Sequence, residues 1–532
     1  MASQSQFGSR QNLVMLYAFL LICLLEVGNI SCYKILVLPG GGSGSHYLYL
    51  GKVGEHLTRA GHDVTLLLGH HNDLEKTPNY SSLFTLEMYD TVMDKTFFET
   101  MNSNVEKTLK GEFSLQLMST LSDTMLEDCK RILQNEQLLA RLMHAKFDIV
   151  VMNNFMNCNV LIAQKLSLPY VIVSTNRPFV QMDTSYLGLP SPVSYVPGAM
   201  TGLTDKMTFA ERLKNLFFQI IAFFFFNFVV FKPYDDLKQL HGIQPDIGLQ
   251  ESLGKSEIVL FAVDWALEFP RPVMPNTVFL GGLLAEESSP LDAEWKDFVD
   301  SADDGIVIFS FGSVANPGAH MPIAEMIMEA LAKLPQKAVI RYKGEPPRTL
   351  GNNTKLTEWM PQNDLLGHPK TKAFIGHGGM NGVYQAIFHG VPMVGIPLYG
   401  DHYDNFARLT SKGMAVTVNV GALTSNKLYN AITTVINEPS YKENAMRLSR
   451  IHRDKPMTPG DSAVFWIEHV IKHGGQHLRP EALNLNFIQY FSLDVISFCV
   501  FIIFVIFVFS KKIVLLCFRW CCKKESTKEK TN

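Results

Sequence analysis

Short apolar runs bounded by glycine or proline occur in two series along the chain and alternate with segments of helical periodicity. The first series comprises KILVLPG (34–40), DVTLLLG (63–69), FDIVVMN (147–153) and YVIVST (170–175). The second series comprises IVIFSFG (306–312), KAVIRYKG (337–344), KAFIG (372–376) and MVGIP (393–397). Such runs are typical of buried parallel strands joined by crossover helices. The pattern predicts an α/β chain with two doubly wound sheets, and 532 residues are enough for two such domains with appendages.

A stretch rich in aromatic, amide, imidazole and carboxylate side chains coincides with the end of the second series. Residues 359–402 read WMPQNDLLGHPKTKAFIGHGGMNGVYQAIFHGVPMVGIPLYGDH. Within them, HGGMN (377–381) falls at the turn between a predicted strand (372–376) and a predicted helix (380–389). Free N–H groups and the positive end of the helix dipole favour an anion at such a turn, and glycine lets the backbone approach it closely. We therefore expect a phosphate-binding site here.

The order and spacing of these residues resemble the donor-binding signature of the UDP-glycosyltransferases. The resemblance implies that Trp359 stacks on uracil, a contact worth roughly 1–3 kcal/mol, and that Gln362 binds the ribose. It also implies that Asp401 and His402 lie on a loop and bind the sugar hydroxyls. The donor-binding residues implied in this way are Ser313, Trp359, Gln362, His377, Gly379, Asn381, Gln385, Asp401 and His402.

The same resemblance implies the GT-B architecture, in which two Rossmann-like domains face each other across a cleft. A segment rich in proline and glycine, residues 268–290, marks a domain boundary, and helices expected within 439–480 close the second domain. The expected division is a signal peptide at 1–32, an acceptor-binding domain at 33–268, a UDP-sugar-binding domain at 269–489, a transmembrane helix at 490–510 and a basic tail at 511–532.

A glycine-rich loop, GGGSGSH (40–46), follows the first predicted strand. It does not match the G-x-G-x-x-G of a dinucleotide-binding site, and the second strand ends without an acidic ribose ligand, which disfavours an oxidoreductase. In the family the histidine of this loop is the catalytic base, and His46 occupies that place. Its imidazole titrates near neutral pH, so it can take the proton of an acceptor hydroxyl in a single inverting displacement.

Two positions depart from the family pattern. The family places an aspartate after the third strand to orient and charge-stabilise the base, whereas this chain has Asn153. In a serine protease, replacing the corresponding aspartate by asparagine lowers the rate about 10⁴-fold. Gln385 stands where the signature has a glutamate for the ribose hydroxyls, so we expect weaker donor binding. These departures keep open the alternative of a UDP-sugar-binding pseudoenzyme or partner subunit.

The donor sugar is indicated by two further positions. Many glucuronosyltransferases have an arginine where this chain has Ala262, and His402 replaces a glutamine in a change associated with galactose. Segments such as LGLPSPVSYVP, LTDKM and LEFPRP resemble the ceramide galactosyltransferase branch. These features favour a neutral hexose such as galactose, with glucuronic acid as the alternative donor sugar.

The two ends of the chain predict a membrane-anchored luminal protein. An apolar core, residues 13–25, preceded by Arg10 has the pattern of a cleaved secretory signal. Near the other end, residues 490–510 are apolar over about 20 residues, which is enough to cross a bilayer, and lysines and arginines follow directly. The last five residues, 528–532, match a K-x-K-x-x retrieval signal. We expect a single-pass type I protein of the endoplasmic reticulum membrane.

A second apolar block, FFQIIAFFFFNFVVF (217–231), is short for a membrane span. It is either a buried core helix or a helix that lies in the membrane interface beside the acceptor entrance. The second interpretation favours lipophilic alcohols, phenols or sphingolipids as acceptors.

Composition excludes some partners and leaves others open. The formal net charge of −3 provides no basic field for nucleic acid. The chain contains no D-x-D motif, so we expect no metal and no cofactor, the UDP-sugar being a co-substrate. Asn79 and Asn352 begin sequons for glycosylation, and Cys129 and Cys158 lie in the expected luminal body with their pairing open. Homo- and hetero-oligomers both remain open.

Overall fold

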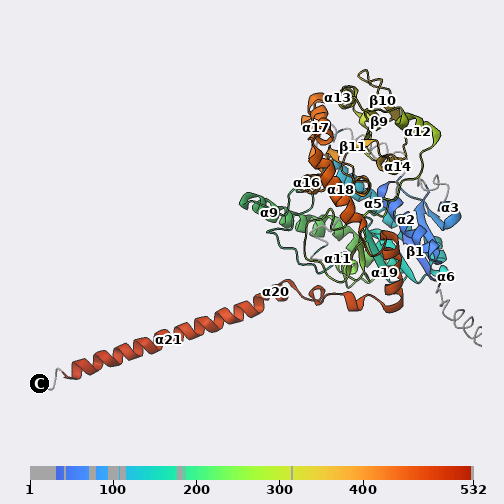
Figure 1. The fold of residues 1–532 in the computed structure, drawn as a ribbon. Coiled ribbons are helices and arrows are strands. Elements are labelled where there is room, and N and C mark those ends of the chain that lie inside the picture. The colour runs from blue at the N-terminus through green and yellow to red at the C-terminus, as the bar shows by residue number, and fades with distance from the viewer. Residues whose placement is uncertain are drawn as a thin grey trace, which may run out of the picture. The chain divides into compact units, whose positions relative to one another are not determined.

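The computed structural model describes residues 32–40, 44–70, 80–93, 97, 107, 115–175, 183, 186–312 and 315–528. The chain divides into two compact units, Met1–Arg479 and Pro480–Asn532. Figure 1 shows the elements of both units. The predicted signal peptide lies outside the described residues except for its last position.

The first sheet is entirely parallel. Its strands follow the order β3-β2-β1-β4-β5-β6-β7. They are β1 (Lys34–Leu38), β2 (Asp63–Gly69), β3 (Thr85–Tyr89), β4 (Ile149–Asn153), β5 (Tyr170–Ser174), β6 (Val259–Phe261) and β7 (Thr277–Phe279).

The second sheet is also parallel, with the order β10-β9-β8-β11-β12-β13. Its strands are β8 (Ile306–Ser310), β9 (Lys337–Arg341), β10 (Thr354–Thr357), β11 (Thr371–Gly376), β12 (Met393–Gly395) and β13 (Ala415–Thr417). Each apolar run singled out in the sequence contains one strand of these two sheets, except that β11 begins one residue before its run. The predicted pair of doubly wound parallel sheets is confirmed.

Helices cover both faces of each sheet. In the first half of the chain they are α2 (Ser45–Arg59), α3 (Tyr80–Leu83), α5 (Leu115–Gln134), α6 (Glu136–Ala145), α7 (Cys158–Lys165), α9 (Phe209–Phe225), the π-helix η2 (Phe226–Phe231), α10 (Lys232–Leu240) and α11 (Leu249–Gly254). In the second half they are α12 (Ala293–Asp300), α13 (Met321–Ala332), α14 (Gln362–Gly367), α15 (Met380–Phe388), α16 (His402–Ser411), α17 (Ser425–Asn437), α18 (Pro439–Arg453) and α19 (Pro459–His473), with 3₁₀ turns at Pro317–Ala319, Val420–Ala422 and Gln476–Leu478.

Helix α19 returns to the first sheet. Its buried residues Ala463, Ile467 and Val470 belong to the same apolar cluster as β1, β2 and α2. The helices of residues 439–480 were expected to close the second domain, but α19 packs on the first sheet. Strand β7 also belongs to the first sheet, so the predicted boundary between residues 268 and 269 precedes the last strand of that sheet.

Each sheet has a topological switch point. In the first sheet the chain proceeds from β1 to β2 and β3 on one side and to β4 and β5 on the other, so β1 and β4 are neighbours. In the second sheet, β8 and β11 are the corresponding neighbours. Ligands of doubly wound sheets bind outside the carboxyl ends of the strands at such points. The residues that follow β1, β4, β8 and β11 are therefore candidates for a binding site.

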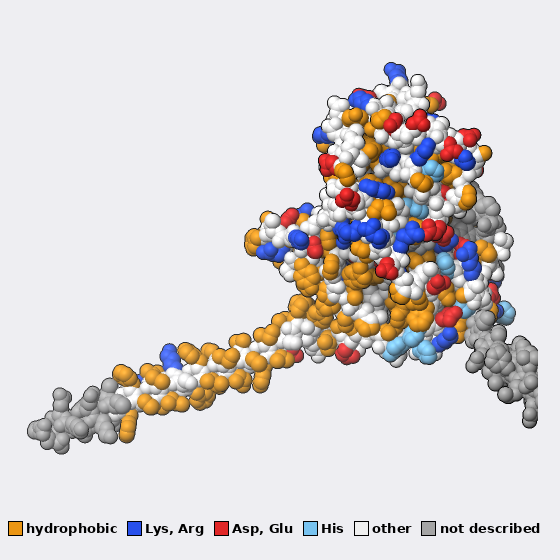
Figure 2. Space-filling view, in the orientation of Figure 1, with side chains coloured by type: hydrophobic (Ala, Val, Ile, Leu, Met, Phe, Trp, Pro, Cys, Tyr) orange, Lys and Arg blue, Asp and Glu red, His pale blue; other side chains and the backbone are white. Residues whose placement is uncertain are grey.

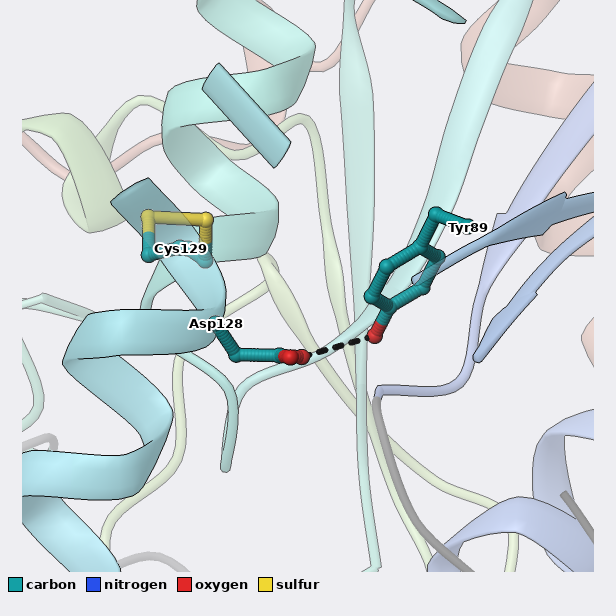
Figure 3. Close-up of a disulfide and its surroundings, with 4 residues drawn as sticks. Tyr89, Asp128 and Cys129 are labelled. Atoms are coloured by element: carbon teal, nitrogen blue, oxygen red, sulfur yellow. Dashed lines mark hydrogen bonds between the residues drawn. A yellow bond between two sulfur atoms is a disulfide. The ribbon is translucent and has the colours of Figure 1, made fainter. Parts of the chain in front are cut away.

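A disulfide between Cys129 on α5 and Cys158 on α7 joins two helices on one face of the first sheet. Figure 3 shows it beside Asp128, whose carboxylate accepts hydrogen bonds from the Tyr89 hydroxyl at 2.9 Å and the Thr91 hydroxyl at 2.7 Å. Burial raises the pKa of Asp128, and the hydrogen bonds of the two hydroxyls counteract this. The pairing that the sequence left open is thus present, and disulfides of this kind are typical of oxidising compartments.

The apolar block predicted at 217–231 lies on α9 and η2. Its side chains are largely exposed, which contradicts the alternative of a buried core helix. Within residues 209–240, an 18-residue stretch has a mean hydropathy of 1.8, and 11% of that stretch is buried. The exposed apolar side chains of α9 and η2 are those of Phe209, Leu213, Leu216, Phe217, Ile220, Ile221, Phe223, Phe224, Phe225, Phe228 and Val229.

The second unit consists of a 3₁₀ turn (Glu481–Leu483), the short helix α20 (Phe487–Tyr490) and the long helix α21 (Leu493–Lys528). Hydrophobic side chains cover α21 over most of its length (Figure 2). Within residues 493–520, an 18-residue stretch has a mean hydropathy of 2.8, which makes this helix long and apolar enough to cross a membrane. It begins at Leu493, whereas the span predicted from the sequence begins at Tyr490, because Ser492 adopts a left-handed conformation with φ of 52° between the two helices.

Candidate functional site

Three polar side chains meet at the carboxyl edge of the first sheet. His46 lies in the first turn of α2, Asn153 ends β4, and Thr175 directly follows β5. Since β1, β4 and β5 are adjacent, the three residues converge. Nδ1 of His46 lies 2.6 Å from the hydroxyl oxygen of Thr175 and 3.3 Å from the amide nitrogen of Asn153. The structure thus brings together the two predicted catalytic residues and adds Thr175, which the sequence analysis missed.

The orientation of the Asn153 amide is determined by the backbone. Its Oδ1 accepts a hydrogen bond of 2.6 Å from the N–H of Phe155. Asn159 donates to the carbonyl oxygens of Asn153 and Leu38, which ties the ends of β4 and β1 together. Because the amide oxygen is committed to Phe155, the NH₂ group faces His46, and an NH₂ group can only donate.

Burial lowers the pKa of His46 below its ordinary value of 6.5. The negative charge of Asp401 raises the pKa in part. Its position in the first turn of α2 also favours the neutral imidazole, because the helix dipole is positive there. His46 is therefore neutral near pH 7, which is the form that a general base requires.

The strand-to-helix turn after β11 is built around the ring of His377. A Cβ atom at Gly312 would lie 2.7 Å from that ring, and one at Gly379 would lie 2.5 Å from it. Gly312 also has φ of 74°, in the left-handed region. Any side chain at either position would displace the ring, so both glycines are needed. Burial lowers the pKa of His377 well below its usual value, and its imidazole is therefore neutral.

The amino-terminal end of α15 follows this turn. Gly379 is the residue before the helix, and no side chain caps the free N–H groups. Asn381 lies in the first turn. Uncapped N–H groups together with the positive end of the helix dipole form a site for an anion such as a phosphate. The predicted placement of these residues at a strand-to-helix turn is confirmed.

Asp401 and His402 lie at the start of α16, where the sequence analysis expected a loop. The carboxylate of Asp401 accepts a hydrogen bond of 2.9 Å from Asn405, and burial raises its pKa. His402 is buried, and burial lowers its pKa to about 3, so its imidazole is neutral. Its ring meets that of His377 edge to face, with the centroids 4.5 Å apart. The helix fixes both residues more firmly than a loop would.

The remaining signature residues lie around the start of α14. Trp359 is 70% exposed, which leaves its indole available for stacking, and the guanidinium of Arg341 lies 5.7 Å from its ring centre. Gln362 donates a hydrogen bond of 2.7 Å to Gln385, and Gln385 donates one of 3.1 Å to the carbonyl of Leu284. The amide at 385 thus makes a bond to a carbonyl that a carboxylate could not make.

Ser313 and Asn79 lie outside the described residues. Asn352 is exposed in a turn before β10, which suits a glycan acceptor, although its glycosylation stays a prediction. Within the ranges that the structure describes, no group of three or more His, Cys, Asp or Glu side chains could hold a metal ion. Metal-independent transfer likewise stays a prediction.

Comparison with known sequences agrees with this geometry. The family model described as UDP-glucoronosyl and UDP-glucosyl transferase matches residues 33–528. The chain is 40% identical to human UDP-glucuronosyltransferase 2B15 over 528 residues, which cover 96% of this chain and 98% of that protein. It is 42% identical to UDP-glucuronosyltransferase 2A3 of Cavia porcellus over 494 residues, covering 90% and 92% of the two chains.

Comparison with solved structures supports the fold. The glycotransferase of kitacinnamycin superposes with a TM-score of 0.58 at 18% identity, covering 83% of this chain and 99% of its own. The glycosyltransferase VinC in complex with DTDP superposes with a TM-score of 0.54 at 16% identity, covering 83% and 100%. The predicted GT-B arrangement of two Rossmann-type sheets is thereby confirmed.

Proposed function

Because the chain belongs to the family of UDP-glucuronosyl and UDP-glucosyl transferases, we propose that it transfers a sugar with inversion from a UDP-sugar to a hydroxyl of a lipophilic acceptor. The observation that carries this proposal is the contact of His46 with Asn153 and Thr175 at the carboxyl edge of the first sheet, and the effect of Asp401 on the pKa of His46 supports it. The candidate base follows the switch point of the first sheet, whereas the candidate sugar-binding carboxylate begins a helix of the second. A base and a donor site that meet in this way are what a direct displacement requires.

The reaction follows from the protonation states. Neutral His46 takes the proton of the acceptor hydroxyl as that oxygen attacks the anomeric carbon. A bond from the acceptor oxygen to the anomeric carbon forms, and the bond from that carbon to the β-phosphate oxygen of UDP breaks. Attack from the face opposite to UDP converts an α-linked donor into a β-glycoside. The proton remains on the imidazole until product leaves.

The leaving group is stabilised by the turn after β11. UDP departs with an additional negative charge on its β-phosphate, and the uncapped amino-terminal end of α15 can hold that charge. His377 is neutral there, so the N–H groups of the backbone and the helix dipole supply the stabilisation. This arrangement supports transfer without a metal ion.

The donor sugar is proposed to be a neutral hexose such as galactose. The two residues proposed to bind the sugar provide no cation, because the imidazole of His402 is neutral and Asp401 carries a carboxyl group. Ala262, which directly follows β6, is buried and apolar, so it provides no cation for a uronate carboxylate. Glucuronic acid is the second candidate, and the observation that favours it is the activity named for both relatives, which are UDP-glucuronosyltransferases.

The setting of the enzyme is proposed to be the endoplasmic reticulum membrane, with the catalytic body in the lumen. The apolar helix α21 supports an anchor, and the disulfide between Cys129 and Cys158 supports an oxidising compartment. The exposed phenylalanines of α9 and η2 support contact with the membrane interface. An acceptor dissolved in the bilayer would then reach the site without crossing water.

The test uses microsomes containing the full chain, radiolabelled UDP-galactose, UDP-glucose and UDP-glucuronic acid, and ceramide, steroid and phenol acceptors. His46→Ala should abolish transfer, and His70→Ala, a change at an exposed histidine in the turn that follows β2, should preserve it. The preferred donor identifies the sugar. No transfer by the parent with any donor, followed by gain of transfer in Asn153→Asp, would overturn the proposal in favour of the UDP-sugar-binding pseudoenzyme.

A further inference from the structure

The two neighbours of Nδ1 in His46 impose opposite demands on the imidazole. The NH₂ group of Asn153, 3.3 Å away, can only donate, so it favours a ring whose Nδ1 is unprotonated. In that tautomer Nε2 carries the hydrogen and cannot accept the proton of a substrate. The Thr175 hydroxyl, 2.6 Å away, can either donate or accept. The tautomer is therefore decided by the threonine.

We propose that Thr175 is the positioning residue of this site: its hydroxyl oxygen accepts the Nδ1–H of His46 and holds the ring in the tautomer whose Nε2 is unprotonated. The inference rests on the proposed function of His46 as a base. It follows from distance, since the contact with Thr175 is 0.7 Å shorter than that with Asn153. It follows also from chemistry, since the amide oxygen of Asn153 is bonded to Phe155.

The same contact gains strength during the reaction. When Nε2 receives the acceptor proton, the ring becomes a cation, and its Nδ1–H donates a charge-assisted hydrogen bond, which is stronger than a neutral one. Thr175 is buried, so water does not compete for that bond. The negative charge that faces the ring is that of Asp401. Asp401 acts on both tautomers through its charge, whereas the hydroxyl of Thr175 distinguishes between them.

The first experiment compares Thr175→Val with Thr175→Ser in the full-length enzyme. Valine has the shape of threonine without the hydroxyl, and serine keeps the hydroxyl. Thr175→Val should lower kcat about 100-fold or more, the usual scale of general base catalysis, with little change in the KM of the UDP-sugar. Thr175→Ser should stay within about threefold of the parent because it keeps the acceptor. Equal kcat values for the parent and the valine variant would overturn the proposal.

Rescue distinguishes positioning from a structural role. In the double variant Thr175→Val with Asn153→Asp, a carboxylate oxygen replaces the amide that faces Nδ1 and can accept its hydrogen. The kcat of this double variant should be at least about tenfold higher than that of Thr175→Val alone, since a carboxylate in this place fixes the tautomer of a catalytic histidine. A purely structural defect at Thr175 would not respond to a change at residue 153.

A chemical readout keeps the inference separate from the proposed function. Diethyl pyrocarbonate attacks an unprotonated imidazole nitrogen, and the tryptic peptide 35–52 contains His46 as its only histidine. Carbethoxylation of this peptide should be slower in Thr175→Val than in the parent and in Thr175→Ser. Equal rates would overturn the role of Thr175 even if the enzyme transfers sugar. If the parent transfers no sugar, slower modification in Thr175→Val than in the parent would still support the tautomer assignment, although the proposed function would fail.

Discussion

The carboxylate of Asp404 on α16 accepts a hydrogen bond of 2.6 Å from the backbone N–H of Met200. Its other oxygen accepts one of 2.8 Å from the N–H of Gly202. Both donors have left-handed backbones, with φ of 61° at Met200 and 64° at Gly202, and this conformation is unfavourable for methionine. The helix that begins with His402 therefore also holds a loop of the predicted acceptor-binding region in an otherwise disfavoured shape.

Asp404→Asn should loosen this loop, because an amide offers one oxygen in place of two and carries no charge. Hydrogen bonds to charged groups contribute about 1.5–3 kcal/mol, so we expect the KM of the acceptor to rise about tenfold or more. The KM of the UDP-sugar should change little. Steady-state kinetics with each substrate varied in turn measures both values. Thr410→Val, at an exposed position of the same helix, is the control, and equal increases in the two KM values would contradict the assignment.

Trp359→Ala should weaken donor binding with little effect on folding. Its indole is 70% exposed, so removing it creates no cavity. Loss of a base stack costs roughly 1–3 kcal/mol, which corresponds to an increase of about 5- to 150-fold in the dissociation constant of UDP. Trp359→Phe keeps an aromatic face and should retain most of the affinity. Isothermal titration with UDP provides the measurement, and unchanged affinity in the alanine variant would place uracil elsewhere.

The rate of transfer should fall as the pH falls through the pKa of His46. Burial lowers that pKa below 6.5, so the neutral base persists at pH 7 and is lost only in more acidic solution. Asp401→Asn removes a charge that raises this pKa, and the acid limb of kcat/KM should move to lower pH. Asp303→Asn, at an exposed turn before β8, should leave the limb in place. A shift to higher pH in Asp401→Asn would show that the limb does not belong to His46.

The sequence predicted the strands that carry the site but missed β6 and the edge strands β3, β7, β10 and β13. The buried runs at β1, β4, β8 and β11 are continuous apolar segments, and burial on both faces produces that pattern. Strands β6, β7 and β13 have three residues each, too few to show any period. The packing of α19 on the first sheet is a long-range contact, and local pattern does not encode it.

The residues of the candidate site likewise include some that could be predicted from the sequence and one that could not. Residues with a fixed spacing within the signature, such as His377 and Gly379, could be located from the sequence because they share one turn. Thr175 could not, because its partner His46 is 129 positions away and only the order of the strands brings them together. The one available signal was that Thr175 follows a predicted strand, where polar residues of a parallel sheet gather.

Helix α9 and η2 should govern access of acceptors that reside in the bilayer. Phe224 and Phe228 are 54% and 67% exposed, and their rings stack with the centroids 6.1 Å apart. Replacing both by asparagine should raise the KM of an acceptor delivered in phospholipid vesicles several-fold, because polar side chains at these positions oppose insertion into the interface. The KM of a water-soluble phenol should not change, since the site itself is intact. Phe465→Asn, a change at an exposed phenylalanine of α19, is the matched control, and equal effects on both acceptors would contradict membrane delivery through α9.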